Sequence, residues 1–168
     1  MSSILNSLAM GVLLATSVWA QQPQEMPAAP VPGQIASAKK IFISNAGEET
    51  IFRLPKDVLF RGGPNRAYNQ FYAAMKSWGR HELVSAPADA DLVFEIGFMD
   101  RNAGPVFVCQ FKLVILDPKT GMALWTITKY VALAGMAKNR EKNYDAAMMD
   151  LMEDVKIIVT PAASAASN

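Results

Sequence analysis

Two β-rich runs that flank a short turn segment constrain the fold of this chain more than any other feature. The first run is Val106–Leu116, the second is Met122–Val131, and Asp117–Gly121 lies between them. Pro118 presets φ for a turn, the preceding aspartate can accept hydrogen bonds from the backbone that follows it, and the glycine accepts a positive φ. The pattern therefore predicts a β-hairpin at the centre of the folded domain.

Two further segments carry apolar residues at helical spacing. The first begins near Pro64 and ends at Gly79, a natural residue to follow a helix, with Gly63 or Asn65 as a possible cap. One face of it is unusually aromatic: Tyr68, Phe71, Tyr72, Met75 and Trp78. The second ends at Pro161, and its periodic residues are Tyr144, Met148, Leu151, Met152, Val155, Ile158 and Val159. Both segments are predicted to be amphipathic helices that pack on the sheet, and Asn139 or Asn143 is predicted to cap the second.

The remaining strands are predicted at Lys39–Ser44, His81–Val84 and Asp91–Phe98, with a turn at Asp100–Pro105. The third of these alternates, so that Leu92, Phe94, Ile96 and Phe98 share one side, while the side with Val93, Glu95 and Gly97 is expected to be less covered. The segment 49–60 has no clear pattern apart from a possible short strand at its end. The fold class is therefore α+β (mixed α/β), with a mixed, mostly antiparallel sheet of about five strands and two amphipathic helices.

The amino-terminal segment has the composition of a secretory signal peptide. Residues 1–20 contain no charged side chain, and an apolar core is followed by Val18-Trp19-Ala20, which suits cleavage after the alanine. We expect a signal peptide at 1–20, a Pro/Gln-rich extended linker at 21–37, a single domain at 38–160 and a disordered Ala/Ser tail at 161–168. The chain is accordingly expected to be exported from a bacterial cytoplasm by a Sec-type route, to the periplasm or beyond.

Composition excludes several classes of protein. Apolar residues make up 51% of the chain, enough for a real core, and sixteen basic residues against fifteen acidic ones give a net charge of +1. This balance argues against nucleic acid as a partner. Cys109 is the single cysteine, so no intramolecular disulfide can form, and its place in an apolar strand predicts burial.

The sequence shows no constellation for catalysis or for metal binding. One histidine, His81, and one cysteine are too few for a metal site, and no nucleophile motif accompanies the histidine. No catalytic residue, metal or cofactor is predicted. The best candidate for a ligand site is the loop containing Arg61, Gly62, Gly63 and Arg66. Its glycines, the amino terminus of the following helix and the two cations could together hold an anion.

Three aromatic side chains, each with one polar group on an apolar ring, are interface candidates: Tyr72, Trp78 and Trp125. For the aromatic face of the first helix, a place in the core is the simpler expectation, and exposure of Tyr72 or Trp78 would favour an interface.

The segments Ala88–Ile96 and Leu113–Trp125 resemble a recurring pattern, in which an Ala-Asp-hydrophobic strand precedes a strand that ends in Asp-X-X-Thr-Gly and resumes at a Trp. This pattern is similar to small periplasmic proteins and lipoproteins related to the N-terminal domain of TolB and to the curli secretion lipoprotein. The resemblance covers about Lys39 to Val159 and implies a mixed-sheet envelope domain used for assembly or binding. Unlike the lipoprotein members, this chain has no cysteine at the predicted cleavage point.

These observations lead us to expect an exported, non-enzymatic envelope protein that acts as a protein-binding or assembly module. Its partner would be another envelope protein, and only an uncleaved signal segment would hold it at the membrane. The alternative is a periplasmic protein that binds a small anion at the Arg61–Arg66 loop. The sequence predicts no oligomeric state.

Overall fold

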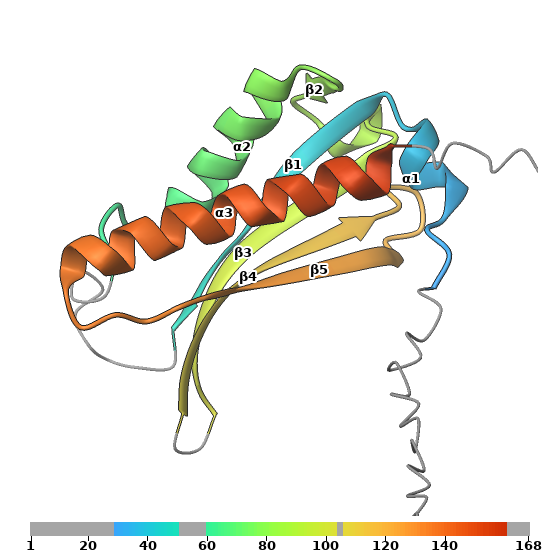
Figure 1. The fold of residues 1–168 in the computed structure, drawn as a ribbon. Helices are drawn as coiled ribbons and strands as arrows, with labels where there is room; N and C mark the ends of the chain where they lie inside the picture. The colour runs from blue at the N-terminus through green and yellow to red at the C-terminus, as the bar shows by residue number, and fades with distance from the viewer. Residues whose placement is uncertain (1–28, 51–59, 104–105, 161–168) are drawn as a thin grey trace, which may run out of the picture.

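The computed structural model describes residues 29–50, 60–103 and 106–160 of the 168-residue chain. In chain order the elements are α1 (Gly33–Ser37), β1 (Lys40–Thr50), α2 (Arg66–Trp78), β2 (Glu82–Val84), the 3-10 helix η1 (Pro87–Asp89), β3 (Leu92–Ala103), β4 (Val106–Leu116), β5 (Ala123–Val131) and α3 (Ala137–Val159). The strands form one mixed sheet in the order β2-β1-β3-β4-β5. Helices α2 and α3 lie on the same face of this sheet (Figure 1). The predicted α+β class is confirmed.

The central hairpin forms as predicted from its turn residues. Strands β4 and β5 pair antiparallel, with Leu113 opposite Ile127. The Asp117 carboxylate accepts hydrogen bonds from the backbone N–H of Lys119 (2.9 Å) and from the Thr120 hydroxyl (2.9 Å), and these bonds lower the pKa of Asp117. Gly121 adopts a φ of 70°, which is the conformation that requires glycine.

The other half of the sheet is parallel. Strand β1 runs between β2 and β3 and is parallel to both. The Asp91 carboxylate accepts hydrogen bonds from the backbone N–H groups of Lys39 (2.8 Å) and Lys40 (2.9 Å), so it fixes the start of β1 beside the start of β3. These backbone hydrogen bonds also lower the pKa of Asp91.

Helix α2 confirms the predicted helix between Pro64 and Gly79. Gly79 ends it in the left-handed region at a φ of 68°, and its N–H donates to the Met75 carbonyl (3.2 Å). Asn65 occupies the N-cap position but makes no side-chain cap; its Oδ1 instead accepts a hydrogen bond from Asn45 Nδ2 (2.9 Å).

Helix α3 begins earlier than predicted. Neither Asn139 nor Asn143 caps it, because the helix already starts at Ala137. Tertiary hydrogen bonds explain the difference. Arg140 Nη1 donates to the Gly135 carbonyl (2.9 Å), and Asn143 Nδ2 donates to the Ala132 carbonyl (2.7 Å), so polar side chains of the first turns hold the incoming loop.

Three other boundaries also differ from the prediction. The end of the predicted linker forms α1, because Ile35 is fully buried at 0% exposure and brings this segment into the core. Strand β1 continues past Ser44 to Thr50, and β3 continues through the predicted turn to Ala103, since backbone pairing does not require apolar side chains. The predicted signal peptide, the tail at 161–168 and most of the possible strand before Phe60 lie outside the described residues.

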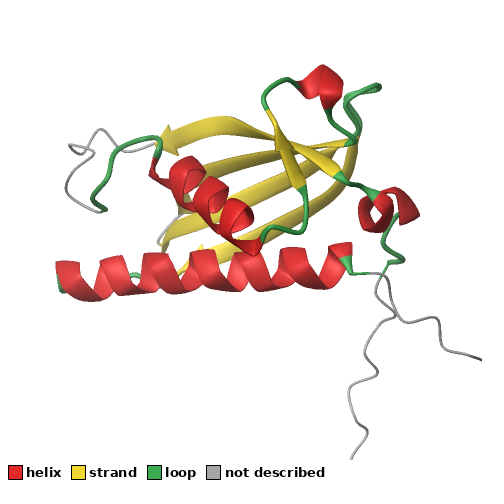
Figure 2. Ribbon diagram, turned by 90° about the horizontal axis from the view of Figure 1, so that it is seen from above, coloured by secondary structure: helices red, strands yellow, loops and turns green. Residues whose placement is uncertain are grey.

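The core lies between the sheet and the two long helices. Its largest fully buried side chains include Phe71, Phe94 and Phe111, and Cys109 is buried beside them, as predicted. Figure 2, seen from above, shows α2 and α3 over one face of the sheet. No described helix packs on the opposite face, which we call the open face. None of the helices in the described ranges is both long and apolar enough to cross a membrane.

Candidate functional site

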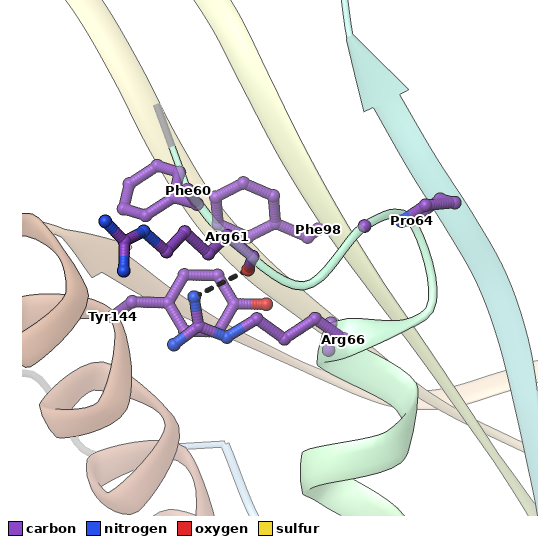
Figure 3. Close-up of a pocket in the computed structure, with 8 residues that line it drawn as sticks. Phe60, Arg61, Pro64, Arg66, Phe98 and Tyr144 are labelled. Atoms are coloured by element: carbon purple, nitrogen blue, oxygen red, sulfur yellow. Dashed lines mark hydrogen bonds between the residues drawn. The ribbon is translucent and has the colours of Figure 1, made fainter. Parts of the chain in front are cut away.

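The Arg61–Arg66 loop leads into α2 and lies against α3 (Figure 3). The Arg66 side chain turns back under the loop, and its Nη1 donates to the Arg61 carbonyl (2.9 Å). The guanidinium also lies over the Tyr144 ring, 3.9 Å from its centroid. Gly62 has a φ of 103°, and a Cβ at this position would lie 2.9 Å from Arg66 Cδ, so this glycine is required both by the backbone and by the packing of the arginine.

Two carboxylates of α3 neutralise the Arg66 guanidinium. Nη1 is ion-paired with Glu141, and Nη2 is ion-paired with Asp145 at 2.8 Å. Glu141 Oε1 also accepts a hydrogen bond from the Arg61 backbone N–H (2.9 Å). The loop therefore joins α2 to α3 through a nearly complete set of internal hydrogen bonds.

The geometry of the loop leaves little room for an anion. The hollow beside it has a volume of about 10 Å³, the space of a single water molecule, and it is lined by Arg61, Gly63 and Arg66 but not by Gly62. Arg61 is exposed, but Arg66, the other cation of the loop, is already ion-paired with Glu141 and Asp145. A ligand role for these four residues stays a prediction.

Below the loop, four aromatic rings close one end of the core. Tyr144 packs against Phe111 at 4.7 Å between ring centroids, against Phe60 at 5.2 Å and against Phe98 at 5.2 Å. Such edge and tilted contacts add to the stabilisation that burial itself provides. We call Phe60, Phe98, Phe111 and Tyr144 the aromatic cluster.

The three predicted interface residues lie on the covered side of the molecule. Tyr72, Trp78 and Trp125 are half-buried and pack against the core, so they are not brought together as one exposed patch. His81 is buried at 8% exposure and meets the Trp78 ring edge-on at 5.4 Å. Its Nδ1 has no hydrogen-bond partner, and burial lowers its pKa from the usual 6.5. Within the described residues, no three His, Cys, Asp or Glu side chains gather as metal ligands.

The open face carries the side chains that alternate with the core residues of the strands. Its apolar members include Phe42, Val93, Met99, Val114 and Leu116, and its polar members include Gln110, Lys112, Thr126 and Thr128. Tyr130 is the most exposed aromatic residue of this face, at 69%. The sequence predicted that Val93, Glu95 and Gly97 share the less covered side of their strand. The three residues do share the open face, but Val93 is buried there at 8% exposure, so only part of this side is less covered.

A hollow of about 180 Å³ lies in the open face beside Gly97. The pairing of β1 with β3 shifts register between Asn45 and Gly47, and this irregularity brings Ala46 beside Gly97. The hollow is lined by Ala46, Gly47, Glu95, Gly97, Phe98, Met99, Lys112 and Val114. The sequence did not predict this hollow, because its position depends on how three strands are aligned with one another. The one local signal was a glycine within an alternating strand.

A larger hollow, of about 810 Å³, lies between the segment before α1 and the end of α3. Its lining is mostly apolar and includes Val31, Ala36 and Ile157. It adjoins the points where the chain continues into residues outside the described ranges.

Comparison with solved structures gives similarities at low sequence identity. A PelC dodecamer from Paraburkholderia phytofirmans is 13% identical over 80% of this chain and 96% of that chain, with a TM-score of 0.46. Lipoprotein GNA1162 from Neisseria meningitidis is 14% identical over 73% of this chain and 99% of that chain, with a TM-score of 0.40. Protein XCC0632 from Xanthomonas campestris, of the family model DUF330, is 12% identical over 79% of this chain and 86% of that chain, with a TM-score of 0.43.

No protein-family model matches the chain, and no curated protein matches it significantly. The solved structures similar to it are thus bacterial proteins that include a lipoprotein and a DUF330 protein, and similarity at this level assigns the chain neither a family nor an activity.

Proposed function

We propose that this chain is an exported, non-enzymatic module that binds a partner protein through the open face of its sheet. The observation that carries the proposal is the one-sided cover of the sheet: α2 and α3 pack on one face, and no described helix packs on the other (Figures 1 and 2). This face exposes Tyr130 and leaves Phe42, Val114 and Leu116 half-buried, and exposed apolar surface of this kind is typical of an interaction site.

The composition of the open face indicates the kind of partner. Tyr130 projects from β5 into solvent, beside the threonines of the same strand and Gln110 of β4. Exposed tyrosine with neighbouring hydroxyl and amide groups is characteristic of interfaces that combine apolar contact with hydrogen bonds. We therefore expect a partner protein that presents both apolar and hydrogen-bonding side chains to β4 and β5.

The exported location rests on the uncharged apolar composition of residues 1–20 and on the resemblance of the strand and turn pattern to periplasmic proteins related to the N-terminal domain of TolB. The non-enzymatic character is supported by the lone histidine, which is buried against Trp78.

Site-specific photo-crosslinking in the producing bacterium tests the proposal. A crosslinking residue at position 130 reports on the open face, and one at Met149, which is 64% exposed on the outer side of α3, is the matched control. We expect one defined adduct from position 130, lost when Thr128 on the same face is replaced by Glu, and no equivalent adduct from position 149. Equal labelling from both positions, or an adduct from position 130 that Thr128→Glu leaves unchanged, would contradict the proposal.

A further inference from the structure

The loop that joins β5 to α3 has no polar side chain. It consists of residues 132–136, with the sequence Ala-Leu-Ala-Gly-Met. Leu133 is 42% exposed and Met136 is 67% exposed, so neither side chain is used to fill the core. Surface connections are ordinarily built from Gly, Pro, Asn, Asp and Ser, and exposed apolar side chains indicate a surface that another body covers.

The backbone carbonyls of this loop are bonded to side chains of α3. Arg140 Nη1 donates to the Ala134 carbonyl (3.1 Å) and to the Gly135 carbonyl (2.9 Å). Asn143 Nδ2 donates to the Ala132 carbonyl (2.7 Å). An unpaired carbonyl is costly to remove from water, so a loop whose carbonyls already have partners within the fold can enter an apolar environment at a lower cost.

Three residues at the start of α3 do not favour the stability of the helix. Met136 occupies the N-cap position and makes no side-chain cap, although Ser, Thr, Asp or Asn would stabilise the helix there. Lys138 lies in the first turn, where a positive charge interacts unfavourably with the helix dipole, and Lys142 is a like charge four positions later. These residues are therefore not explained by a contribution to folding.

The two lysines are available to a negatively charged surface. Lys138 and Lys142 are exposed, and positions four apart lie on the same side of a helix. Neither has an ion-pair partner among the described residues, since the carboxylates of Glu141 and Asp145 are paired with Arg66. The apolar loop is thus followed directly by two uncompensated positive charges.

We propose that residues 132–136 dock on the surface of a bilayer that contains anionic lipids. Leu133 and Met136 enter the boundary between the headgroups and the acyl chains, and Lys138 and Lys142 lie against the lipid phosphates. Two apolar side chains are too small a surface for a stable protein interface, which buries about 800 Å² on each partner. A few apolar side chains combined with cations are sufficient for reversible binding to an anionic membrane.

This contact is independent of the other ways in which the chain could be held in place. The loop lies at one end of α3, and α1, close to the point where the described chain begins, lies at the other (Figure 1). An uncleaved signal segment is therefore not required for the docking of the loop, and neither is a partner protein on the open face.

Fluorescence from a label at position 136 tests the proposal. Met136→Cys in the full chain carries an environment-sensitive nitrobenzoxadiazole group, and Cys109 stays unlabelled because it is buried at 1% exposure. The vesicles consist of phosphatidylcholine alone or of an equimolar mixture with phosphatidylglycerol. We expect stronger, blue-shifted emission with the anionic vesicles only. The same label at Met149, which is exposed about 20 Å farther along α3, should not respond.

Variants that keep the label at position 136 separate the two parts of the contact. Lys138→Gln combined with Lys142→Gln should weaken binding to anionic vesicles about 25-fold, since each lysine near such a surface contributes a factor of about five. Leu133→Ser should weaken it about tenfold through the loss of apolar burial. Lys76→Gln combined with Lys119→Gln, which removes two exposed lysines elsewhere, is the matched control and should leave binding unchanged.

The proposal is overturned if phosphatidylcholine vesicles shift the emission as strongly as anionic ones, if the label at position 149 responds equally, or if the control pair of lysines matters as much as Lys138 and Lys142. An unchanged label at position 136, which membrane binding through residues 1–20 alone would give, also overturns it. Partner docking is measured separately by crosslinking at position 130, so either result can fail while the other stands.

Discussion

The charged side chains on the two faces of the sheet differ in whether they are ion-paired within the fold. On the covered face, the Arg66 guanidinium is shared between Glu141 and Asp145, and Lys129 of β5 is paired with Asp154 of α3 at 2.8 Å. On the open face, Glu95 and Lys112 flank a hollow and have no partner among the described residues. Charges on the covered face hold helices to the rest of the fold, whereas charges on the open face remain available to another molecule.

The apolar groups differ in the same sense. The aromatic cluster on the covered face forms mutual ring contacts at 4.7–5.4 Å, while Tyr130 on the open face is 69% exposed. Residues of the same chemical type are thus used for packing on one side and are free for binding on the other. A set of matched substitutions can test this division.

The largest expected effect concerns the aromatic cluster. Phe111→Ala should lower the free energy of unfolding by about 3–5 kcal/mol, because it leaves a cavity among rings that cannot collapse to fill it. Tyr130→Ala, an aromatic truncation on the open face, should change it by less than about 0.5 kcal/mol. Urea unfolding followed by tryptophan fluorescence measures both values, and similar losses would show that the two faces do not differ in this way.

The next effect concerns the two arginines of the loop before α2. Arg66→Met should cost about 2 kcal/mol of unfolding free energy, because it leaves Glu141 and Asp145 without their cation. Arg61→Met should cost less than about 0.5 kcal/mol, since its side chain is exposed. If Arg61→Met proves the more harmful change in the same unfolding assay, the described ion pairs do not hold α2 to α3.

A smaller effect concerns pH. Burial lowers the pKa of His81 below 6.5, so the unfolded chain takes up a proton first as the pH falls, and the unfolding free energy should decrease below about pH 6.5. His81→Gln should flatten this part of the profile. The pKa of Asp91 is also lowered, so protonation of Asp91 also decreases the unfolding free energy, but only below its usual pKa of 3.8. The effects of the two groups therefore fall in different pH ranges. Melting temperatures between pH 5 and pH 7.5 test this, and equal slopes in both proteins would contradict it.

The smallest expected effect distinguishes two glutamates. Glu95→Gln should leave the unfolding free energy unchanged within about 0.5 kcal/mol or raise it slightly, because no pair is lost. Glu141→Gln should lower it by about 1 kcal/mol, because it weakens the bond to Arg66. Chemical denaturation of the two variants side by side is the measurement. A clear loss of stability in Glu95→Gln would mean that its carboxylate has a structural role.

The features that could be predicted from the sequence are those that depend on local geometry. Asp117, Pro118 and Gly121 encode a turn whatever surrounds them, and Gly79 ends α2 through its own backbone conformation. The alternation along β3 also identified which side chains share a face, since period two is a property of the strand alone.

The features that the sequence did not reveal depend on residues far apart in the chain. Arg66 was interpreted as a cation available to an anion, but its partner Glu141 is 75 positions away on α3. The hollow at Gly97 needs the relative register of β1, β3 and β4, and α1 forms because Ile35 reaches the core. No local pattern reports such pairings, because each is decided by tertiary packing.

The placement of β1 has a consequence for the order in which the chain can fold. Its neighbours in the sheet, β2 and β3, both follow it in sequence, and the carboxylate that fixes its start is 52 positions ahead of Lys39. The amino-terminal third of the domain therefore cannot complete any part of the sheet by itself, and such non-local pairing slows folding. A chain that emerges amino terminus first therefore keeps β1 without a sheet partner until β2 and then β3 have followed.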